Sequence, residues 1–139
     1  MKSLRKRTDT LTSERGAAAV EFALIATVLV MLLFGILEYG RLFGELEVLE
    51  SAAREGARAA SVHCGNAEGC TAADIQTAVT TAAAGYALDA VPTADLDCSD
   101  PANFGKPVAV GWAQTFDLDI PFVTLPTITR SISGVFRCE

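Results

Sequence analysis

The sequence predicts an α+β fold in which a long N-terminal helix and a shorter second helix accompany a small C-terminal antiparallel β-sheet. Three observations support this prediction. An apolar run over Ala17–Leu37 continues into a helical spacing of apolar side chains up to Ala60, a capped apolar stretch follows Thr71, and two C-terminal stretches alternate between apolar and polar residues. Because so few strands need a helix to cover them, we expect the long helix to lie against the sheet.

The first sixteen residues form a basic segment ahead of the apolar run. They carry five of the eleven Lys and Arg residues but only two of the seventeen Asp and Glu residues. The 21 residues from Ala17 to Leu37 would form a helix of about 30 Å, which matches the hydrocarbon core of a bilayer. Because basic residues before a span stay in the cytoplasm, we expect residues 17–37 to cross the inner membrane once and residues 38–139 to form an exported α+β domain, periplasmic or extracellular.

Glu21 is the only charged residue within this apolar run. A carboxylate near the centre of a bilayer costs roughly 2.5–3.5 kcal/mol, so an acid at such a position indicates a functional role and a partner. The structural alternative is that Glu21, in the second turn of the span, lies close enough to the cytoplasmic interface to reach water.

The helical pattern continues beyond the membrane to Ala60. Apolar side chains recur at spacings of three and four along one face, at Leu42, Leu46, Leu49, Ala53, Ala57 and Ala60. Gly35, Gly40 and Gly44 each weaken a helix by up to about 1 kcal/mol, so a bend or break near Tyr39–Gly44 is the alternative to one uninterrupted helix.

Charged residues occupy the other side of this helix. Glu38 and Arg41 are expected to form an interfacial pair at the outer end of the span rather than a binding site. Arg54, Glu55 and Arg58 form either a solvated face or a contact with a partner helix, and the sequence leaves both interpretations open.

A second helix is predicted over Ala72–Leu88. Thr71 can cap it, and Asp74 lies at the position where a carboxylate completes a capping box. The expected apolar face comprises Ile75, Val79, Ala82, Ala83 and Tyr86.

Two antiparallel strands are predicted over Val108–Leu118 and Thr127–Cys138, because apolar residues alternate along both. Two prolines in the linker Pro121–Pro126 predict an irregular connection. Trp112, Phe116 and Phe136 are expected to be core residues of the sheet rather than a ligand platform.

All four cysteines follow the apolar run, and an even number in an exported segment favours disulfide bonds. Three pairings are possible, and we favour Cys64 with Cys70 and Cys98 with Cys138 because the first pair brackets a Gly-rich loop. A zinc site that includes His63 is the rival interpretation, but the cysteine spacing lacks a paired short motif and we expect no metal.

Charge and motif content exclude other classes of function. Residues 17–139 carry six basic and fifteen acidic side chains, a balance that disfavours nucleic-acid binding. His63 is the sole histidine, no Gly-rich phosphate loop occurs, and the spacing of Asp117 and Asp119 fits a solvated strand edge better than a catalytic pair. We therefore expect neither enzymatic activity nor a cofactor.

Several blocks resemble TadE-type proteins, the pseudopilin-like components of tight-adherence (Tad, or Flp) pilus systems. The resemblance covers about the first sixty residues. It rests on the Gly16/Ala17 junction with Glu21 five places on and Phe22 beside it, on Phe34-Gly35-Ile36-Leu37-Glu38-Tyr39-Gly40-Arg41, and on Ala52-Ala53-Arg54-Glu55-Gly56-Ala57-Arg58.

The resemblance implies that a prepilin peptidase cuts between Gly16 and Ala17, removing the cytoplasmic leader of residues 1–16 and leaving the span as an anchor. In the family model the carboxylate at the position of Glu21 pairs with the new α-amino group of a neighbouring subunit. The implied partners are this peptidase, other pilins or pseudopilins, platform proteins of the inner membrane and the lipid bilayer. Phe22, where small Flp pilins have Tyr, and the larger body favour a minor or assembly component. An uncleaved single-pass periplasmic adaptor and an anchored enzyme or binding domain are the alternatives.

Overall fold

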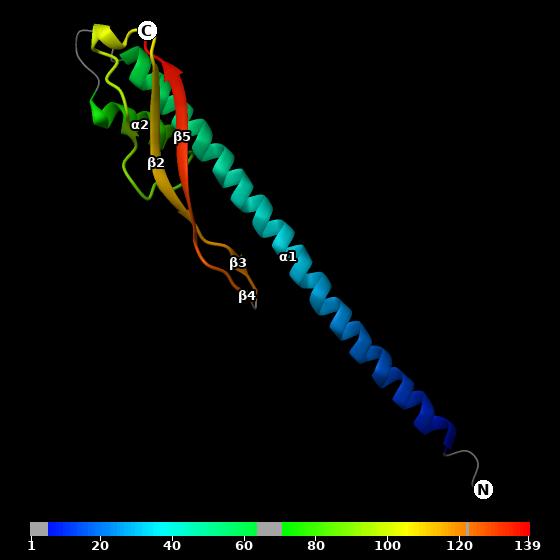
Figure 1. Cartoon of the computed structure of the whole chain (residues 1–139). Helices are drawn as coiled ribbons and strands as arrows, with labels where there is room; N and C mark the ends of the chain where they lie inside the picture. The colour runs from blue at the N-terminus through cyan, green and yellow to red at the C-terminus, as the bar shows by residue number, and fades with distance from the viewer. Residues whose placement is uncertain (1–5, 64–70, 122) are drawn as a thin grey trace. The chain divides into compact units, whose positions relative to one another are not determined.

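The computed structural model describes residues 6–63, 71–121 and 123–139, and the predicted α+β class is confirmed (Figure 1). The helices are α1 (Lys6–His63), α2 (Ala72–Ala82) and the short 3₁₀ helix η1 (Pro101–Asn103). The strands are β1 (Thr93–Ala94), β2 (Pro107–Phe116), β3 (Asp119–Ile120), β4 (Val123–Thr124) and β5 (Ile128–Arg137). The chain divides into two compact units, a helix–hairpin unit of the residues up to Glu38 with Asp119–Thr124, and a sheet unit of Tyr39–Leu118 with Leu125–Glu139.

Helix α1 is uninterrupted through Gly40 and Gly44, so the alternative of a break near these residues is wrong. In the sheet unit, the predicted apolar face of α1 is confirmed. Leu49, Ala53, Ala57 and Ala60 are buried in the core, while Leu42 and Leu46 are partly buried against it. These positions are spaced by three or four residues, and burial of one such face is what holds the C-terminal part of α1 on the sheet.

Small residues let α1 approach the sheet closely. A Cβ atom added at Gly134 of β5 would overlap the backbone of Ala53 and Arg54, and one added at Gly56 would overlap a methyl group of Val79 on α2. Contact at Gly134 is therefore backbone against backbone, which only a residue without a side chain permits. This contact fixes the height of α1 above the sheet.

The main sheet has the order β1-β2-β5, with antiparallel pairing throughout. Both predicted strands are present, and Figure 1 shows β2 and β5 side by side. Their register pairs Val110 with Gly134 and Trp112 with Ile132. Along β2 the residues of even number are buried, as the alternation predicted.

Three expectations about these elements are wrong. Helix α2 has the predicted capping box, since the Thr71 amide donates to Asp74 Oδ2 at 3.0 Å, but it ends at Ala82 and not at Leu88. The chain leaves the helix because Ala84 and Gly85 adopt φ values of 53° and 95°, so Tyr86 follows the helix and is 40% exposed. Phe136 is 37% exposed, because it lies near the end of β5, although Trp112 and Phe116 are buried as expected.

The linker between the two long strands is more regular than predicted. Asp119 pairs with Thr124 and Ile120 with Val123, which makes a short antiparallel hairpin of β3 and β4. The prolines limit the hairpin rather than prevent it, because Pro121 follows β3 and needs no ladder donor there. The expectation of an irregular connection is therefore wrong over these residues.

Cys98 and Cys138 form a disulfide bond, one of the two pairings favoured from the sequence. The backbone beside Cys138 is held by two further bonds, from its own amide to the Lys106 carbonyl and from the Gly105 amide to the Cys138 carbonyl, both at 2.9 Å. Near Cys98, the hydroxyl and amide of Ser99 donate to Asp97 and lower the pKa of that carboxyl. Cys64 and Cys70 lie outside the described residues, as does the side chain of His63.

Candidate functional site

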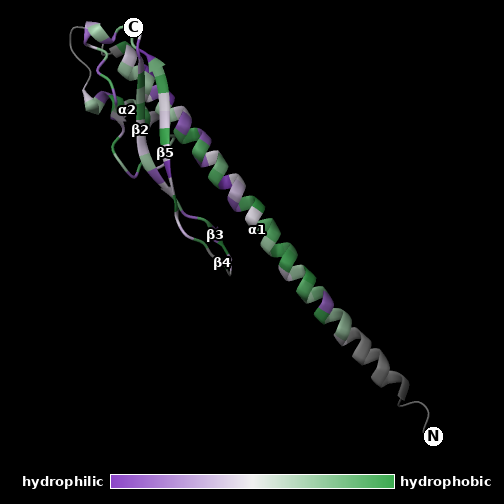
Figure 2. Ribbon diagram, viewed as in Figure 1, coloured by the Kyte–Doolittle hydropathy of each residue, from purple (hydrophilic) through white to green (hydrophobic). Residues whose placement is uncertain are grey.

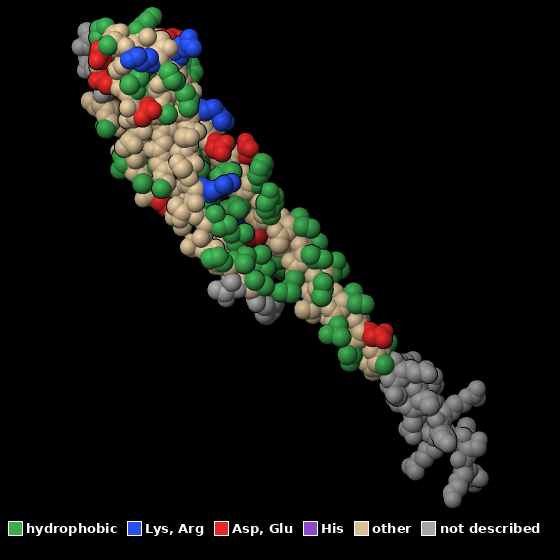
Figure 3. Space-filling view, viewed as in Figure 1, with side chains coloured by type: hydrophobic (Ala, Val, Ile, Leu, Met, Phe, Trp, Pro, Cys, Tyr) green, Lys and Arg blue, Asp and Glu red, His purple; other side chains and the backbone are tan. Residues whose placement is uncertain are grey.

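Over residues 17–37, α1 exposes a mainly apolar surface that Glu21 and Thr27 interrupt. Figure 2 shows this part of the ribbon as hydrophobic, and hydrophobic side chains cover it on the face seen in Figure 3. Phe22 is 74% exposed and Leu24 67%. Large contiguous apolar surfaces on a folded chain mark contacts with a membrane or another protein. Among the described residues, this helix is long and apolar enough to cross a membrane.

Gly16, Ala17 and Glu21 all lie on this exposed part of α1. Ala17 and Glu21 are four residues apart, so they lie on the same face of the helix. The junction between Gly16 and Ala17 lies inside the helix, and nothing approaches within 4 Å of a Cβ atom added at Gly16. The candidate site is thus an accessible Gly16–Ala17 junction whose second residue lies about one helical turn before Glu21.

The other polar side chain of the apolar run has an internal partner. Thr27 donates its hydroxyl to the carbonyl of Ala23 at 2.8 Å. This bond to the preceding turn satisfies the hydroxyl within the helix, so Thr27 adds little to the cost of transfer into lipid. Glu21 differs, because an ionised carboxylate can only accept hydrogen bonds and the described side chains of residues 17–25 around it are apolar.

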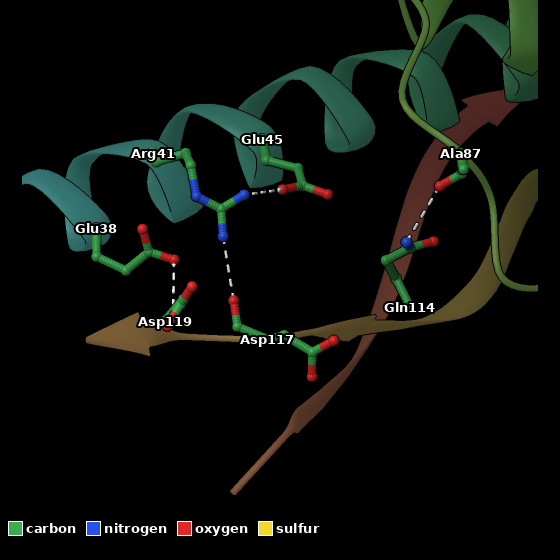
Figure 4. Close-up of polar contacts among 7 residues, drawn as sticks. All are labelled: Glu38, Arg41, Glu45, Ala87, Gln114, Asp117 and Asp119. Carbon is green, nitrogen blue, oxygen red and sulfur yellow. Dashed lines mark hydrogen bonds and ion pairs between the residues drawn. The ribbon is translucent and has the colours of Figure 1, made fainter. Parts of the chain in front are cut away.

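The β3–β4 hairpin covers one face of α1 within the helix–hairpin unit. Ala26, Met31, Gly35 and Glu38 are half-buried, whereas most of their neighbours on α1 are exposed. The amide of Asp119 donates to Glu38 Oε1 at 3.2 Å (Figure 4). Nearer the N-terminus, a groove of about 330 Å³ is lined by Ala26, Thr27, Val30, Met31, Phe34 and Pro121.

Arg41 and its partners form a second polar cluster, in the sheet unit. Its guanidinium donates to the carbonyl of Asp117 at 3.1 Å and pairs with Glu45 at 3.5 Å (Figure 4). The sequence analysis did not predict that Glu38 binds the Asp119 amide or that Arg41 binds the Asp117 carbonyl, and the Glu38–Arg41 pair itself stays a prediction. Farther along α1, Glu55 and Arg58 form an exposed pair at 3.6 Å.

Gln114 is a structural residue that the sequence analysis missed. It is 3% exposed, and its Nε2 donates to the Ala87 carbonyl at 3.2 Å (Figure 4). Its Oε1 accepts from the Asp89 amide at 3.2 Å and from Trp112 Nε1 at 3.0 Å. The sequence did contain a signal: Gln114 is a polar residue at one of the alternating positions of the strand that are buried, and a buried amide needs hydrogen-bond partners.

An exposed apolar helix joined to a small α+β unit is the arrangement expected of a protein that is anchored in a membrane by one helix. Comparison with protein families gives a more particular result. The model of the TadE-like protein family matches residues 16–58, so the resemblance inferred from the sequence is confirmed over this segment. The matched segment begins at Gly16 and includes Glu21. No curated protein and no solved structure matches the chain.

Proposed function

We propose that this protein is a membrane-anchored, pseudopilin-like component of Tad (Flp) pilus assembly, processed by a prepilin peptidase between Gly16 and Ala17. The observation that carries the proposal is the TadE-like match beginning at Gly16, together with the single acid on an exposed apolar helix. The role is non-enzymatic and requires no cofactor. The basic leader lies in the cytoplasm, and the part of the chain after residue 37 lies on the opposite side of the inner membrane.

Processing requires the helix to open around the scissile bond. A protease acts on extended backbone, whereas α1 is helical from Lys6 onward. Gly16 assists in two ways: it lowers the cost of unwinding by about 1 kcal/mol relative to Ala, and it has no side chain to obstruct a narrow active site. The apolar span stays attached to the exported part after the cut.

Removal of residues 1–16 creates a positive α-amino group on Ala17. Glu21 lies one helical turn from Ala17. When two helices pack side by side at a suitable height, the carboxylate of one chain can therefore meet the α-amino group of the other. Pairing the two charges offsets much of the cost of placing either one in hydrocarbon. Because the pair forms only when the helices are in one register, it also selects how subunits assemble. The proposed partners are the peptidase, other pilins or pseudopilins and the platform proteins of the inner membrane.

Co-expression with the cognate peptidase tests the processing step. Mass spectrometry of the membrane-bound product should find a chain that begins at Ala17, and Gly16→Leu should block the cut. Gly35→Leu is the matched control, since nothing lies within 4 Å of an added Cβ at either glycine and processing should survive. An intact leader in the presence of active peptidase would instead support an uncleaved adaptor.

The assembly step is tested with Glu21→Gln, which keeps the size of the side chain and removes its charge. Processing should continue, while pilus formation or recovery of the assembly complex should fall at least tenfold. Glu47→Gln, at an exposed position of α1 in the sheet unit, serves as the control and should assemble normally. Normal piliation of the Glu21 variant would remove the carboxylate from the mechanism.

A further inference from the structure

The β3–β4 hairpin lies beside α1 at a position that is unexpected for a purely exported domain. Within the helix–hairpin unit, Asp119 is bound to Glu38, the first residue after the predicted span. Pro121 lines the groove that also contains Val30, Met31 and Phe34. These three helix residues belong to the apolar run, and so the hairpin points from the end of the span back along it.

The depth of the hairpin follows from the rise of the helix. The helix residues that line this groove run from Phe34 through Val30 to Ala26, which precede Glu38 by four, eight and twelve residues and so lie about 6, 12 and 18 Å toward the membrane side at 1.5 Å per residue. If Glu38 marks the boundary of the outer leaflet, the Pro121 end of the hairpin lies at this depth. Elements that lie in a membrane interface bury their apolar faces by about 5–10 Å, which overlaps the shallow part of this range.

The chemistry of the hairpin suits this environment. Ile120, Pro121 and Val123 are apolar, and each is half-buried rather than enclosed. The pairing of Ile120 with Val123 satisfies backbone groups inside the hairpin, and Pro121 has no amide hydrogen to desolvate. Asp119, in contrast, lies level with Glu38, where water is available.

We infer that the β3–β4 hairpin inserts its apolar end into the outer leaflet of the bilayer beside α1, so that the lipid acyl chains contact Ile120, Pro121 and Val123. The protein is then held in the membrane by the helix and by the β3–β4 hairpin, rather than by the helix alone. This inference rests on the proposed membrane anchoring and adds a second lipid-binding element. The continuity of the hairpin with the exposed apolar surface of α1 favours lipid over a protein partner.

Tryptophan quenching by brominated lipids measures the insertion. The full chain is reconstituted in phosphatidylethanolamine–phosphatidylglycerol vesicles whose acyl chains carry bromine at a shallow or a deep position. Probes are placed singly by Val123→Trp and Ile120→Trp in the hairpin, in a Trp112→Phe background. Leu24→Trp reports on the anchor, and Thr115→Trp, at an exposed position of β2, reports on the sheet unit.

Both hairpin probes should be quenched at least twofold more than the Thr115 probe, and most strongly by the shallow bromine. The Leu24 probe should be quenched as well. Quenching at Leu24 without quenching in the hairpin would overturn the insertion and leave the anchor standing. No quenching at Leu24 would overturn both the insertion and the anchoring on which it rests. If circular dichroism shows that the Trp112→Phe variant does not fold, the quenching of each probe is measured with Trp112 retained, because this buried residue contributes a constant fluorescence.

Discussion

Gly134 shows how one residue sets the distance between two layers of the fold. It lies opposite Val110 in the sheet, on the face that meets α1, and the helix backbone at Ala53 and Arg54 occupies the space of a side chain. The alternation of β5 predicted a strand through this position, but not that the glycine was required there. A strand pattern records which side chains are buried, whereas the need for glycine arises from a helix some eighty residues away in the sequence.

Gly134→Ala should destabilise the sheet unit by about 1–3 kcal/mol, because a methyl group at this position overlaps a backbone that cannot rotate away. Denaturant unfolding of the full chain in detergent, followed by the fluorescence of Trp112, measures the change. Gly44→Ala is the matched control: nothing lies within 4 Å of its added Cβ, and replacing glycine inside a helix stabilises it by up to about 1 kcal/mol. Equal stability of the two variants would contradict the close contact at Gly134.

At the scale of elements, sequence patterns predicted long segments and missed short ones. The long strands β2 and β5 repeat their alternation often enough to be recognised, and the apolar stripe of α1 does the same. Strand β1 has only two residues, and its place beside β2 is secured by Asp95. The Asp95 amide donates to the Ala109 carbonyl at 3.0 Å, and its carboxylate accepts from the Ala109 amide at 2.7 Å. Here a single carboxylate accepts the hydrogen bond that a neighbouring strand would otherwise accept, and one such residue produces no periodic pattern in the sequence.

The segment after α2 depends in the same way on Gln114. We expect Gln114→Leu to destabilise the protein by about 1–3 kcal/mol, because it leaves the Ala87 carbonyl, the Asp89 amide and the Trp112 indole without their partner. Hydrogen exchange at the Asp89 amide should accelerate more than exchange in the centre of β2. Thr115→Val, which changes an exposed neighbour on the same strand, should alter neither quantity. Unchanged exchange at Asp89 in the Gln114 variant would show that the segment is held by other contacts.

For the candidate site, the local sequence pattern was sufficient to identify the residues, but not to predict which other segments lie near them. Glu21 and the Gly16–Ala17 junction were identified because charge and apolarity can be read directly along a helix. The position of the β3–β4 hairpin on α1 could not be predicted, since Glu38 and Asp119 are 81 residues apart and are joined through a backbone amide. Any residue except proline could supply that donor, so sequence composition carries no trace of it.

At the scale of the whole molecule, one disulfide bond within the described residues closes much of the C-terminal part of the chain. The disulfide joins Cys98, in the loop before η1, to Cys138 after β5, across 40 positions of the chain. It therefore limits the unfolded states of a segment that contains β2, β3, β4 and β5. Such a bond agrees with the proposed placement outside the inner membrane, where disulfides persist.

Replacing Cys98 and Cys138 together by serine should lower the free energy of unfolding by about 4 kcal/mol, the value that loop-closure entropy gives for a ring of this size. Thermal unfolding of the oxidised protein provides the measurement. The pair Cys64→Ser and Cys70→Ser is the control, and should cost less because any ring between these two positions is much smaller. A larger loss of unfolding free energy in the Cys64/Cys70 variant would show that Cys98–Cys138 is not the disulfide bond that stabilises the protein most.

The hairpin, whose Pro121 lines a groove with Ala26 and Met31, also makes the anchor one-sided. In the proposed assembly, neighbouring subunits pack against the remaining face of the helix, and the hairpin leaves each anchor with one closed side. Such a subunit accepts neighbours from some directions around the helix and excludes them from the side that the hairpin occupies.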